Sequence, residues 1–162
     1  MNNFSVKFNG HTFWISRSIA VVGFIYGYDN DGNEYILAVQ RGTGTPDPEF
    51  VGCWCLPCGY LDYDETIEEA LKREIFEETG LTLKDSYFIN LLDVNSDPKS
   101  DKRQNVTFRY ECVVQEPITE VKLTAKNSEK NEVSDIKWIP TDEIDNYKWA
   151  FNHNELIKYY NE

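Results

Sequence analysis

Hydrophobic and polar positions along this chain form short apolar runs separated by turn-forming residues. Residues 19–28 and 35–40 are apolar enough to be buried strands, and the polar DNDGN segment between them predicts a tight turn. A shorter hairpin is expected over residues 4–15, around the turn dipeptide Asn9-Gly10. The later elements are expected as strands over 88–94, 105–114 and 135–139, a helical turn over 143–147 and a closing helix over 154–160.

The clearest helix is predicted over residues 66–79. Thr66 and Glu69 form a capping box, whose side chains satisfy free amides of the first turn. Gly80 stands where a left-handed residue commonly ends a helix. Strands and helices thus intermix without strict alternation. We expect a single α/β domain over residues 1–162, with helices packed on a mixed sheet.

The apolar face of this helix turns acidic halfway along. At 100° per residue, the face that is apolar in the first two turns continues as Glu74, Glu77 and Glu78, and Thr79 falls on the opposite side. Like charges at this spacing repel one another, and near a helix C-terminus they oppose the dipole. A bound cation would compensate, and carboxylates suit hard ions such as Mg²⁺ or Mn²⁺. The alternative is a solvated acidic face.

Composition and charge exclude several classes of protein. The 28 acidic and 16 basic residues give a net charge of −12, which disfavours nucleic-acid binding because such a surface repels phosphate backbones. The longest apolar stretch, Ile19–Tyr28, is too short to span a bilayer and contains two glycines. The first ten residues lack the features of a secretory signal. We therefore expect a cytoplasmic protein that binds no membrane.

Cys53, Cys55 and Cys58 lie close together in the sequence, and Cys112 is remote. A closed zinc site needs four ligands, usually in CxxC pairs or with nearby histidines. The two histidines are far apart in the sequence, so a fourth ligand would have to come from elsewhere. We expect reduced thiols in a loop beside a functional site rather than a zinc cluster.

Residues 59–81, GYLDYDETIEEALKREIFEETGL, match the Nudix box at every defined position. The box begins at Gly59, continues through Glu65, and closes with the REIFEETGL segment that starts at Arg73. Upstream, Trp54-Cys-Leu-Pro57 resembles the family's strand and turn into the box, and Trp138-Ile-Pro140 resembles a late strand. The chain therefore resembles Nudix hydrolases over roughly residues 17 to 145. The resemblance implies an α/β/α sandwich with a mixed β-sheet, in which a catalytic loop-helix-loop forms the metal site.

The resemblance implies metal-binding roles for the acidic helix face. Glu74, Glu77 and Glu78 would bind Mg²⁺ or Mn²⁺, and Glu74 would also act in catalysis through a metal-bound water. The main-chain carbonyl at the position of Cys58, where the family often has glycine, is a further candidate metal ligand. The metal would neutralise a diphosphate and align its displacement by water.

Other box residues would position these acids. Arg73 would orient them by ion pairing and so contribute to catalysis. Glu65 would pair with Arg73 and, like Gly59, anchor the loop. The general base would be a box glutamate or an acid of a later loop, where Glu129 and Glu132 are available and Glu132 is preferred for its distance from the strand at 135–139.

The substrate is indicated by weaker features. Arg17 and Arg41 are candidate phosphate-binding residues because arginine binds phosphates bidentately. Aromatic rings could stack on a base, and Trp54 is the candidate chosen among them. The tail Ala150-Phe-Asn-His153 resembles a segment of some Nudix proteins that act on ADP-ribose-like substrates.

These features favour hydrolysis of a nucleoside diphosphate linked to another group, with ADP-ribose as the model. Two alternatives stay open. One is a nucleoside triphosphate pyrophosphohydrolase, and the other is a non-catalytic Nudix-like sensor that binds a nucleotide and regulates a partner. The only expected partner besides a small-molecule nucleotide is a second copy of the chain, as a homodimer.

Overall fold

The computed structural model describes residues 3–98, 103–124 and 131–161. Its elements follow one another along the chain in this order: β1 (Phe4–Phe8), β2 (His11–Ile15), β3 (Ile19–Tyr28), β4 (Glu34–Arg41), η1 (Pro48–Phe50), β5 (Trp54–Cys55), β6 (Cys58–Tyr60), α1 (Ile67–Thr79), β7 (Phe88–Asn95), β8 (Val106–Val113), η2 (Ile118–Glu120), β9 (Val133–Pro140), η3 (Thr141–Asn146) and α2 (His153–Asn161).

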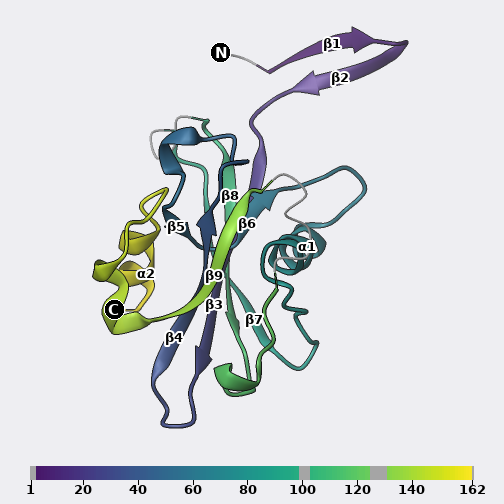
Figure 1. Cartoon of the computed structure of the whole chain (residues 1–162). Coiled ribbons are helices and arrows are strands. Elements are labelled where there is room, and N and C mark those ends of the chain that lie inside the picture. The colour runs from purple at the N-terminus through teal and green to yellow at the C-terminus, as the bar shows by residue number, and fades with distance from the viewer. Residues whose placement is uncertain (1–2, 99–102, 125–130, 162) are drawn as a thin grey trace.

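A seven-stranded mixed sheet forms the middle layer of the molecule. Its main path runs β5-β4-β3-β8-β7, with β6 paired to β3 and β9 paired to β4. β3 and β8 are parallel, and the other pairs are antiparallel. α1 covers one face of the sheet and α2 the other (Figure 1). The predicted α/β/α arrangement with a mixed sheet is confirmed.

The central strand β3 serves both layers of the core because its side chains alternate between the faces of the sheet. Val21 and Ile25 pack in the cluster beneath α1, whereas Val22, Phe24 and Tyr26 pack in the cluster on the α2 side. This two-sided burial explains why the strand reads as a continuous apolar run rather than as an alternating pattern.

β3 and β4 pair only at the end that carries their connecting turn, over Tyr26–Tyr28 and Glu34–Ile36. Farther along, β4 pairs with β5 and the start of β3 pairs with β6. The segment from β5 to β6 therefore lies where the two long strands separate. The amide of Gly23 donates to the carbonyl of Pro57 at 2.9 Å, which fixes this insertion. β6 then leads directly into the loop before α1.

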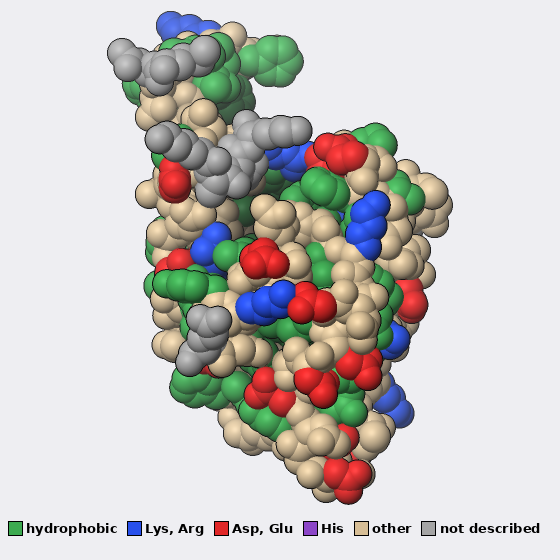
Figure 2. All heavy atoms as spheres, turned by 90° about the vertical axis from the view of Figure 1, so that its left-hand side faces the viewer, with side chains coloured by type: hydrophobic (Ala, Val, Ile, Leu, Met, Phe, Trp, Pro, Cys, Tyr) green, Lys and Arg blue, Asp and Glu red, His purple; other side chains and the backbone are tan. Residues whose placement is uncertain are grey.

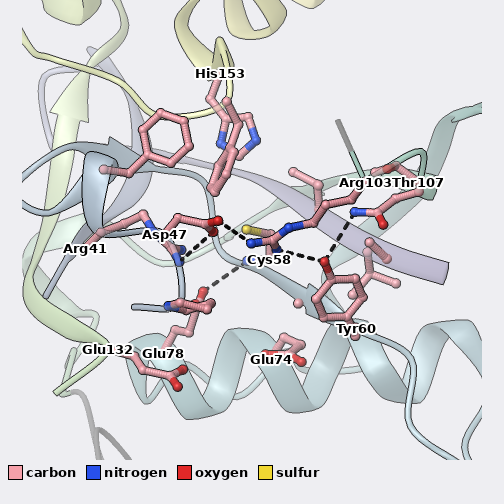
Figure 3. A pocket seen from close by; sticks show the side chains of 18 of the residues that line it. Arg41, Asp47, Cys58, Tyr60, Glu74, Glu78, Arg103, Thr107, Glu132 and His153 are labelled. Atoms are coloured by element: carbon pink, nitrogen blue, oxygen red, sulfur yellow. Dashed lines mark hydrogen bonds and ion pairs between the residues drawn. The ribbon is translucent and has the colours of Figure 1, made fainter. Parts of the chain in front are cut away.

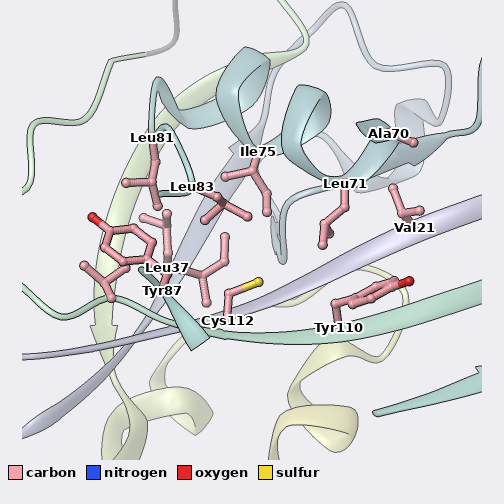
Figure 4. Close-up of a cluster of buried hydrophobic side chains, with 12 residues drawn as sticks. Val21, Leu37, Ala70, Leu71, Ile75, Leu81, Leu83, Tyr87, Tyr110 and Cys112 are labelled. Atoms are coloured by element: carbon pink, nitrogen blue, oxygen red, sulfur yellow. The ribbon is translucent and has the colours of Figure 1, made fainter. Parts of the chain in front are cut away.

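α1 packs on the sheet through the buried side chains of Ala70, Leu71 and Ile75 (Figure 4). Thr79, in the last turn, is buried as well. The placement of Thr79 on the opposite side was wrong. The buried stripe advances by four residues, from Leu71 to Ile75 and Thr79. The Thr79 hydroxyl is satisfied within the helix because it donates to the Ile75 carbonyl at 2.6 Å. The acids consequently flank the buried stripe.

Both ends of α1 follow the prediction. The Thr66 side chain accepts from the Glu69 amide, and the Glu69 carboxylate accepts from the Thr66 amide. Gly80 is left-handed, with φ 72°, and its amide donates to the Phe76 carbonyl. The helix that carries the acids is thus fixed by local sequence at each end.

The sequence missed the short strand β6, and β4, β7 and β9 extend slightly beyond their predicted bounds. The predicted hairpin is present as β1 and β2, which stand away from the rest of the molecule (Figure 1). None of the helices in the described ranges has the length and apolar character needed to cross a membrane.

Candidate functional site

A pocket of about 760 Å³ opens between α1, the sheet and the start of α2 (Figure 3). Its floor is formed by the first residues of β3 and by β6, and one wall is the acidic side of α1. The β4–η1 loop, the β7–β8 region and residues 149–153 complete the enclosure. The volume falls in the range of pockets that hold small-molecule ligands.

Glu74 and Glu78 face this pocket from α1, and Gly59 allows them to do so. A Cβ at Gly59 would stand 2.0 Å from Glu74 Cδ, so a larger residue here would displace the Glu74 carboxylate from its place. The Cys58 amide donates to Glu78 Oε2 at 3.0 Å. The pKa of each carboxyl is raised, mainly because burial disfavours the charged form. At Glu74, the neighbouring Arg73 lowers the pKa and offsets part of this effect.

Arg73 is the centre of an ion-pair network. Its Nε and Nη2 donate to the two oxygens of Glu65 at 3.0 and 2.6 Å, and its Nη1 donates to Glu74 at 2.8 Å and to Glu77 at 3.4 Å. The Tyr60 carbonyl accepts a further bond at 2.9 Å. These bonds raise the pKa of the guanidinium and lower that of Glu65. Arg73 thus ties the loop before α1 to the acids of the helix.

The loop residue Glu65 is itself fixed at both oxygens. Besides Arg73, its Oε1 accepts from the Asp62 amide at 2.7 Å. The geometry therefore brings together the predicted orienting arginine, its carboxylate partner and the box glycine.

The three helix acids fit a divalent cation in their donor chemistry. One oxygen each of Glu74 and Glu77 is held by Arg73, and one of Glu78 by a main-chain amide, while no hydrogen bond within the described residues takes up their second oxygens. The carboxylates do not converge on one point: no three His, Cys, Asp or Glu side chains in the described ranges are grouped closely enough to hold a metal. A cation bound between these acids would offset their mutual repulsion.

The wall opposite the acidic helix is basic. Arg41 lies over the Phe151 ring, 5.2 Å from its centroid, and pairs with Asp47 and Thr45. Arg103 also pairs with Asp47 and donates to the Tyr60 hydroxyl at 2.9 Å (Figure 3). Asp47 therefore holds two guanidinium groups at the pocket.

Four residues lining the pocket have a buried polar atom without a hydrogen-bond partner among the described residues. They are Arg41 and Arg109, each at Nε, Asn105 at Oδ1 and Asp47 at Oδ2. Such atoms are costly to bury unless a ligand or water pairs with them. The pocket thus offers both donors and acceptors to a polar ligand.

The tail segment that had indicated an ADP-ribose-like substrate forms part of this pocket, through Phe151, Asn152 and His153. His153 Nδ1 accepts from the Leu56 amide at 2.9 Å, which joins α2 to the segment before the box. Burial lowers the His153 pKa to about 3, so the ring is neutral. As a neutral acceptor, His153 holds the start of α2 against the segment before the box.

Two predicted substrate residues lie elsewhere. Arg17 does not line the pocket: it donates to the carbonyls of Ser96 and Asn105, both at 2.8 Å, and of Gln104, so it fastens the β7–β8 connection. Trp54 is buried in the core, edge-on to Tyr147, because β5 turns its side chain inward. The predicted substrate contacts of these two residues are corrected accordingly.

Other rings occupy the place expected of Trp54. Phe50, Tyr60, Trp149 and Phe151 line the pocket, and Phe50 packs edge-on to Phe151 with centroids 4.8 Å apart. Arg41, in contrast to Arg17, does reach the pocket, as predicted.

Glu132 lines the pocket from the segment before β9. Its carbonyl accepts from the Gly42 amide at 2.7 Å, which fastens this segment to the β4–η1 loop. The alternative acid, Glu129, lies outside the described residues.

All four cysteines are free thiols. Cys55 and Cys58 lie in strands β5 and β6 and not in a loop as expected, because this segment pairs with β4 and β3. Cys58 lines the pocket, and its hydrogen bond with Cys55, together with burial, raises its pKa.

Sequence reasoning missed Asp47, Arg103 and Arg109. Asp47 lies in the β4–η1 loop, and none of the three residues belongs to a sequence motif. Nothing in their spacing could have shown that they line one pocket, because they come from three separate parts of the chain.

Comparisons with known proteins agree with this geometry. The family model described as NUDIX domain matches residues 17–160. The chain is 33% identical over 148 residues to an ADP-ribose pyrophosphatase of Methanocaldococcus jannaschii, covering 91% of this chain and 75% of that protein. It is 26% identical over 144 residues to Nudix hydrolase 2 of Arabidopsis thaliana, covering 89% of this chain and 46% of that protein.

Among solved structures, the NUDIX domain of Shewanella oneidensis NrtR complexed with ADP ribose is similar. It aligns with a TM-score of 0.74 and 25% sequence identity, covering 91% of this chain and 88% of that chain.

Proposed function

The chain belongs to the Nudix family of pyrophosphohydrolases, and from this premise we propose that it hydrolyses the diphosphate linkage of a nucleoside diphosphate joined to a second group, with ADP-ribose as the favoured substrate. The observation that carries the proposal is the two-sided pocket. Acids that suit a cation stand on one side, and two guanidinium groups with aromatic rings stand on the other.

Hydrolases of this family generally use a divalent metal ion. Here Glu74, Glu77 and Glu78 would hold Mg²⁺ or Mn²⁺, with the Cys58 carbonyl as a further ligand. When bound, the ion would neutralise diphosphate oxygens and make phosphorus more open to attack by water. The all-oxygen donor set is the reason to prefer these hard ions to zinc.

The chain's own residues would supply orientation and proton transfer. Arg73 would hold Glu74 and Glu77 in place while Glu65 keeps the loop closed over the helix. Glu132, which lines the same pocket, would accept the proton of the attacking water. The water oxygen would form a new bond to one phosphorus while the bond from that phosphorus to the bridging oxygen breaks. The bridging oxygen would leave with the other phosphate, so the products are two phosphate monoesters.

The opposite wall would bind the rest of the substrate. Arg41 and Arg103 carry charge complementary to phosphate, and their guanidinium groups are held in place by Asp47. Trp149 and Phe151 offer flat surfaces to a base. The unpartnered acceptor of Asn105 suits a hydroxyl donor, which a sugar provides.

The test is a substrate panel at equal low concentration with Mg²⁺ and with Mn²⁺. ADP-ribose should have the highest kcat/KM and give AMP and ribose phosphate, and a chelator should abolish turnover. A nucleoside triphosphate with higher kcat/KM, releasing pyrophosphate, would replace the proposed substrate. Undiminished turnover in excess chelator would contradict metal dependence. Hydrolysis in heavy-oxygen water then identifies the attacked phosphorus from the labelled product.

A further inference from the structure

Tyr60 makes hydrogen bonds to an arginine on each wall of the pocket. Its main-chain carbonyl accepts from Arg73 Nη2 at 2.9 Å, on the side of the acidic helix. Its hydroxyl accepts from Arg103 Nη1, also at 2.9 Å, on the basic side. The last residue of β6 therefore connects the ion-pair network of α1 to the basic wall, through its main chain on one side and its side chain on the other.

The Arg103 guanidinium is held at both of its end nitrogens. Nη1 donates to the Tyr60 hydroxyl, and Nη2 pairs with the Asp47 carboxylate (Figure 3). A longer contact, from the Asn105 side-chain amide at 3.5 Å, reaches the same hydroxyl. Because a guanidinium is planar and its N–H groups point in fixed directions, two partners at different nitrogens set both its position and its tilt.

Fixed guanidinium groups matter here because the chain as a whole repels an anion. The net charge is −12, and on the face shown in Figure 2 basic side chains are interspersed with acidic ones instead of forming a broad patch. Long-range attraction therefore contributes little to the binding of a phosphate-containing substrate. Its binding depends on short-range contacts with guanidinium groups held at the pocket.

The acids of α1 would compete for a guanidinium group that is free to turn. Glu74 and Glu78 line the same pocket as Arg103, and a guanidinium pairs with carboxylates as well as with phosphates. Without its two partners, the Arg103 side chain would be drawn towards these acids, which are the proposed metal ligands. Asp47 and Tyr60 keep its charge on the opposite wall, where the phosphates of a substrate would meet it.

The contact between Tyr60 and Arg103 contributes little to the stability of the fold. Tyr60 is 39% exposed, and the side chain of Arg103 is 41% exposed. Polar contacts between exposed side chains add little to the free energy of unfolding. Removing this contact should therefore change where the guanidinium lies more than it changes the stability of the domain.

We propose that Tyr60 is a positioning residue, whose hydroxyl fixes the Arg103 guanidinium at the place where it binds an anionic group of the substrate. This role rests on the proposed function, since it requires a pocket that binds a phosphate-containing substrate. The bond from Arg73 reaches the main chain of Tyr60, so it survives a change of the side chain. A change confined to the hydroxyl should consequently leave the acids of α1 undisturbed.

Tyr60→Phe removes the hydroxyl and keeps the ring and the carbonyl. KM for ADP-ribose should rise about three- to tenfold, the range that one hydrogen bond supports, while kcat stays within about twofold of wild type. Calorimetric titration with ADP-ribose in chelator should show the same rise in Kd without any turnover. Tyr63→Phe is the matched control because Tyr63 is 87% exposed in the loop before α1, and it should leave KM and Kd unchanged.

Arg103→Gln tests whether Tyr60 acts through Arg103. In the double variant, loss of the Tyr60 hydroxyl should add nothing to the Kd of Arg103→Gln alone, because the group that it positions is already absent. The melting temperature of Tyr60→Phe should stay within about 2 °C of wild type, which separates a change of position from a loss of stability.

An unchanged Kd in Tyr60→Phe, an equal effect of Tyr63→Phe, or additive effects of Tyr60→Phe and Arg103→Gln overturns the positioning role. A wild-type protein that does not bind ADP-ribose in chelator also overturns it, even where hydrolysis with metal is observed, because the basic wall then contributes no binding of its own. Binding in chelator without hydrolysis in metal would instead contradict the proposed hydrolysis and leave the role of Tyr60 intact.

Discussion

Replacing Glu78 by glutamine should move stability and activity in opposite directions. The carboxylate stands beside Cys58 and one helical turn from Glu74, and burial raises its pKa well above the usual range. The hydrogen bond from the Cys58 amide, at 3.0 Å, can be kept by the side-chain oxygen of glutamine. The substitution therefore removes the charge and keeps the contact.

Without metal, the variant should be slightly more stable than wild type. Removing the repulsion between the charges of Glu78 and Glu74 stabilises the fold by about 0.2–0.5 kcal/mol. The variant also no longer has to bury a charged carboxylate, which stabilises it further. Because 1 kcal/mol corresponds to roughly 2–4 °C in a domain of this size, we expect Tm to rise by about 1–3 °C. Loss of a carboxylate proposed to bind the metal should lower turnover by about a hundredfold or more, which is roughly 3 kcal/mol in activation free energy.

The pH dependence has a definite sign. A carboxyl whose pKa is raised by folding favours the folded state when protonated, so its cost is absent below the ordinary pKa of 4.5. The cost appears as pH rises towards and through the raised pKa. The Tm difference between Glu78→Gln and wild type should therefore be smallest in acid and grow towards neutral pH.

Thermal unfolding followed by circular dichroism in chelator measures this difference, and adding Mg²⁺ should stabilise wild type more than the variant. Glu68→Gln is the matched control because Glu68 is exposed in the first turn of the same helix, where removing a negative charge should lower Tm slightly. If metal-free Glu78→Gln melts several degrees below wild type, Glu78 is a structural residue and the metal-site reasoning fails.

Four further substitutions test the pocket and its surroundings. Gly59→Ala puts a methyl group 2.0 Å from Glu74 Cδ, so unfolding in denaturant should show a loss of about 1–3 kcal/mol together with reduced turnover, and a variant of unchanged stability would contradict the close approach. Arg73→Lys cannot form two parallel hydrogen bonds to a carboxylate, so the free energy of unfolding should fall by about 1–3 kcal/mol and kcat should fall more than KM changes. Arg41→Gln should raise KM for ADP-ribose, whereas Arg17→Gln should lower Tm and leave KM unchanged; the reverse outcome would restore Arg17 to the site.

Local sequence determined the elements whose ends are fixed by residues within the element itself. The capping box at Thr66, the left-handed Gly80 and the turn at Asn9-Gly10 each satisfy main-chain groups within a few residues, so they were predicted at the correct positions. The apolar run of β3 was also recognised. The Nudix box fixed the family because its spacing places acids, arginine and glycine around one helix end.

Elements and contacts that depend on residues far apart in the sequence could not be predicted from local patterns. β6 is a strand only because β3 and β4 separate and leave room for it. Trp54 and Arg17 looked like substrate residues, but the inward turn of β5 and three main-chain carbonyls assign them to the core and to a loop.

The basic wall of the pocket is the clearest case of a feature decided by tertiary structure. Arg41, Asp47 and Arg103 come from a strand end and two loops, and only the folded sheet brings them opposite the acids of α1. Sequence by itself determined the acidic helix, because its acids repeat at helical spacing and its ends cap themselves. Charged groups far apart in the chain have no such local rule, so the tertiary structure alone decided what faces that helix across the pocket.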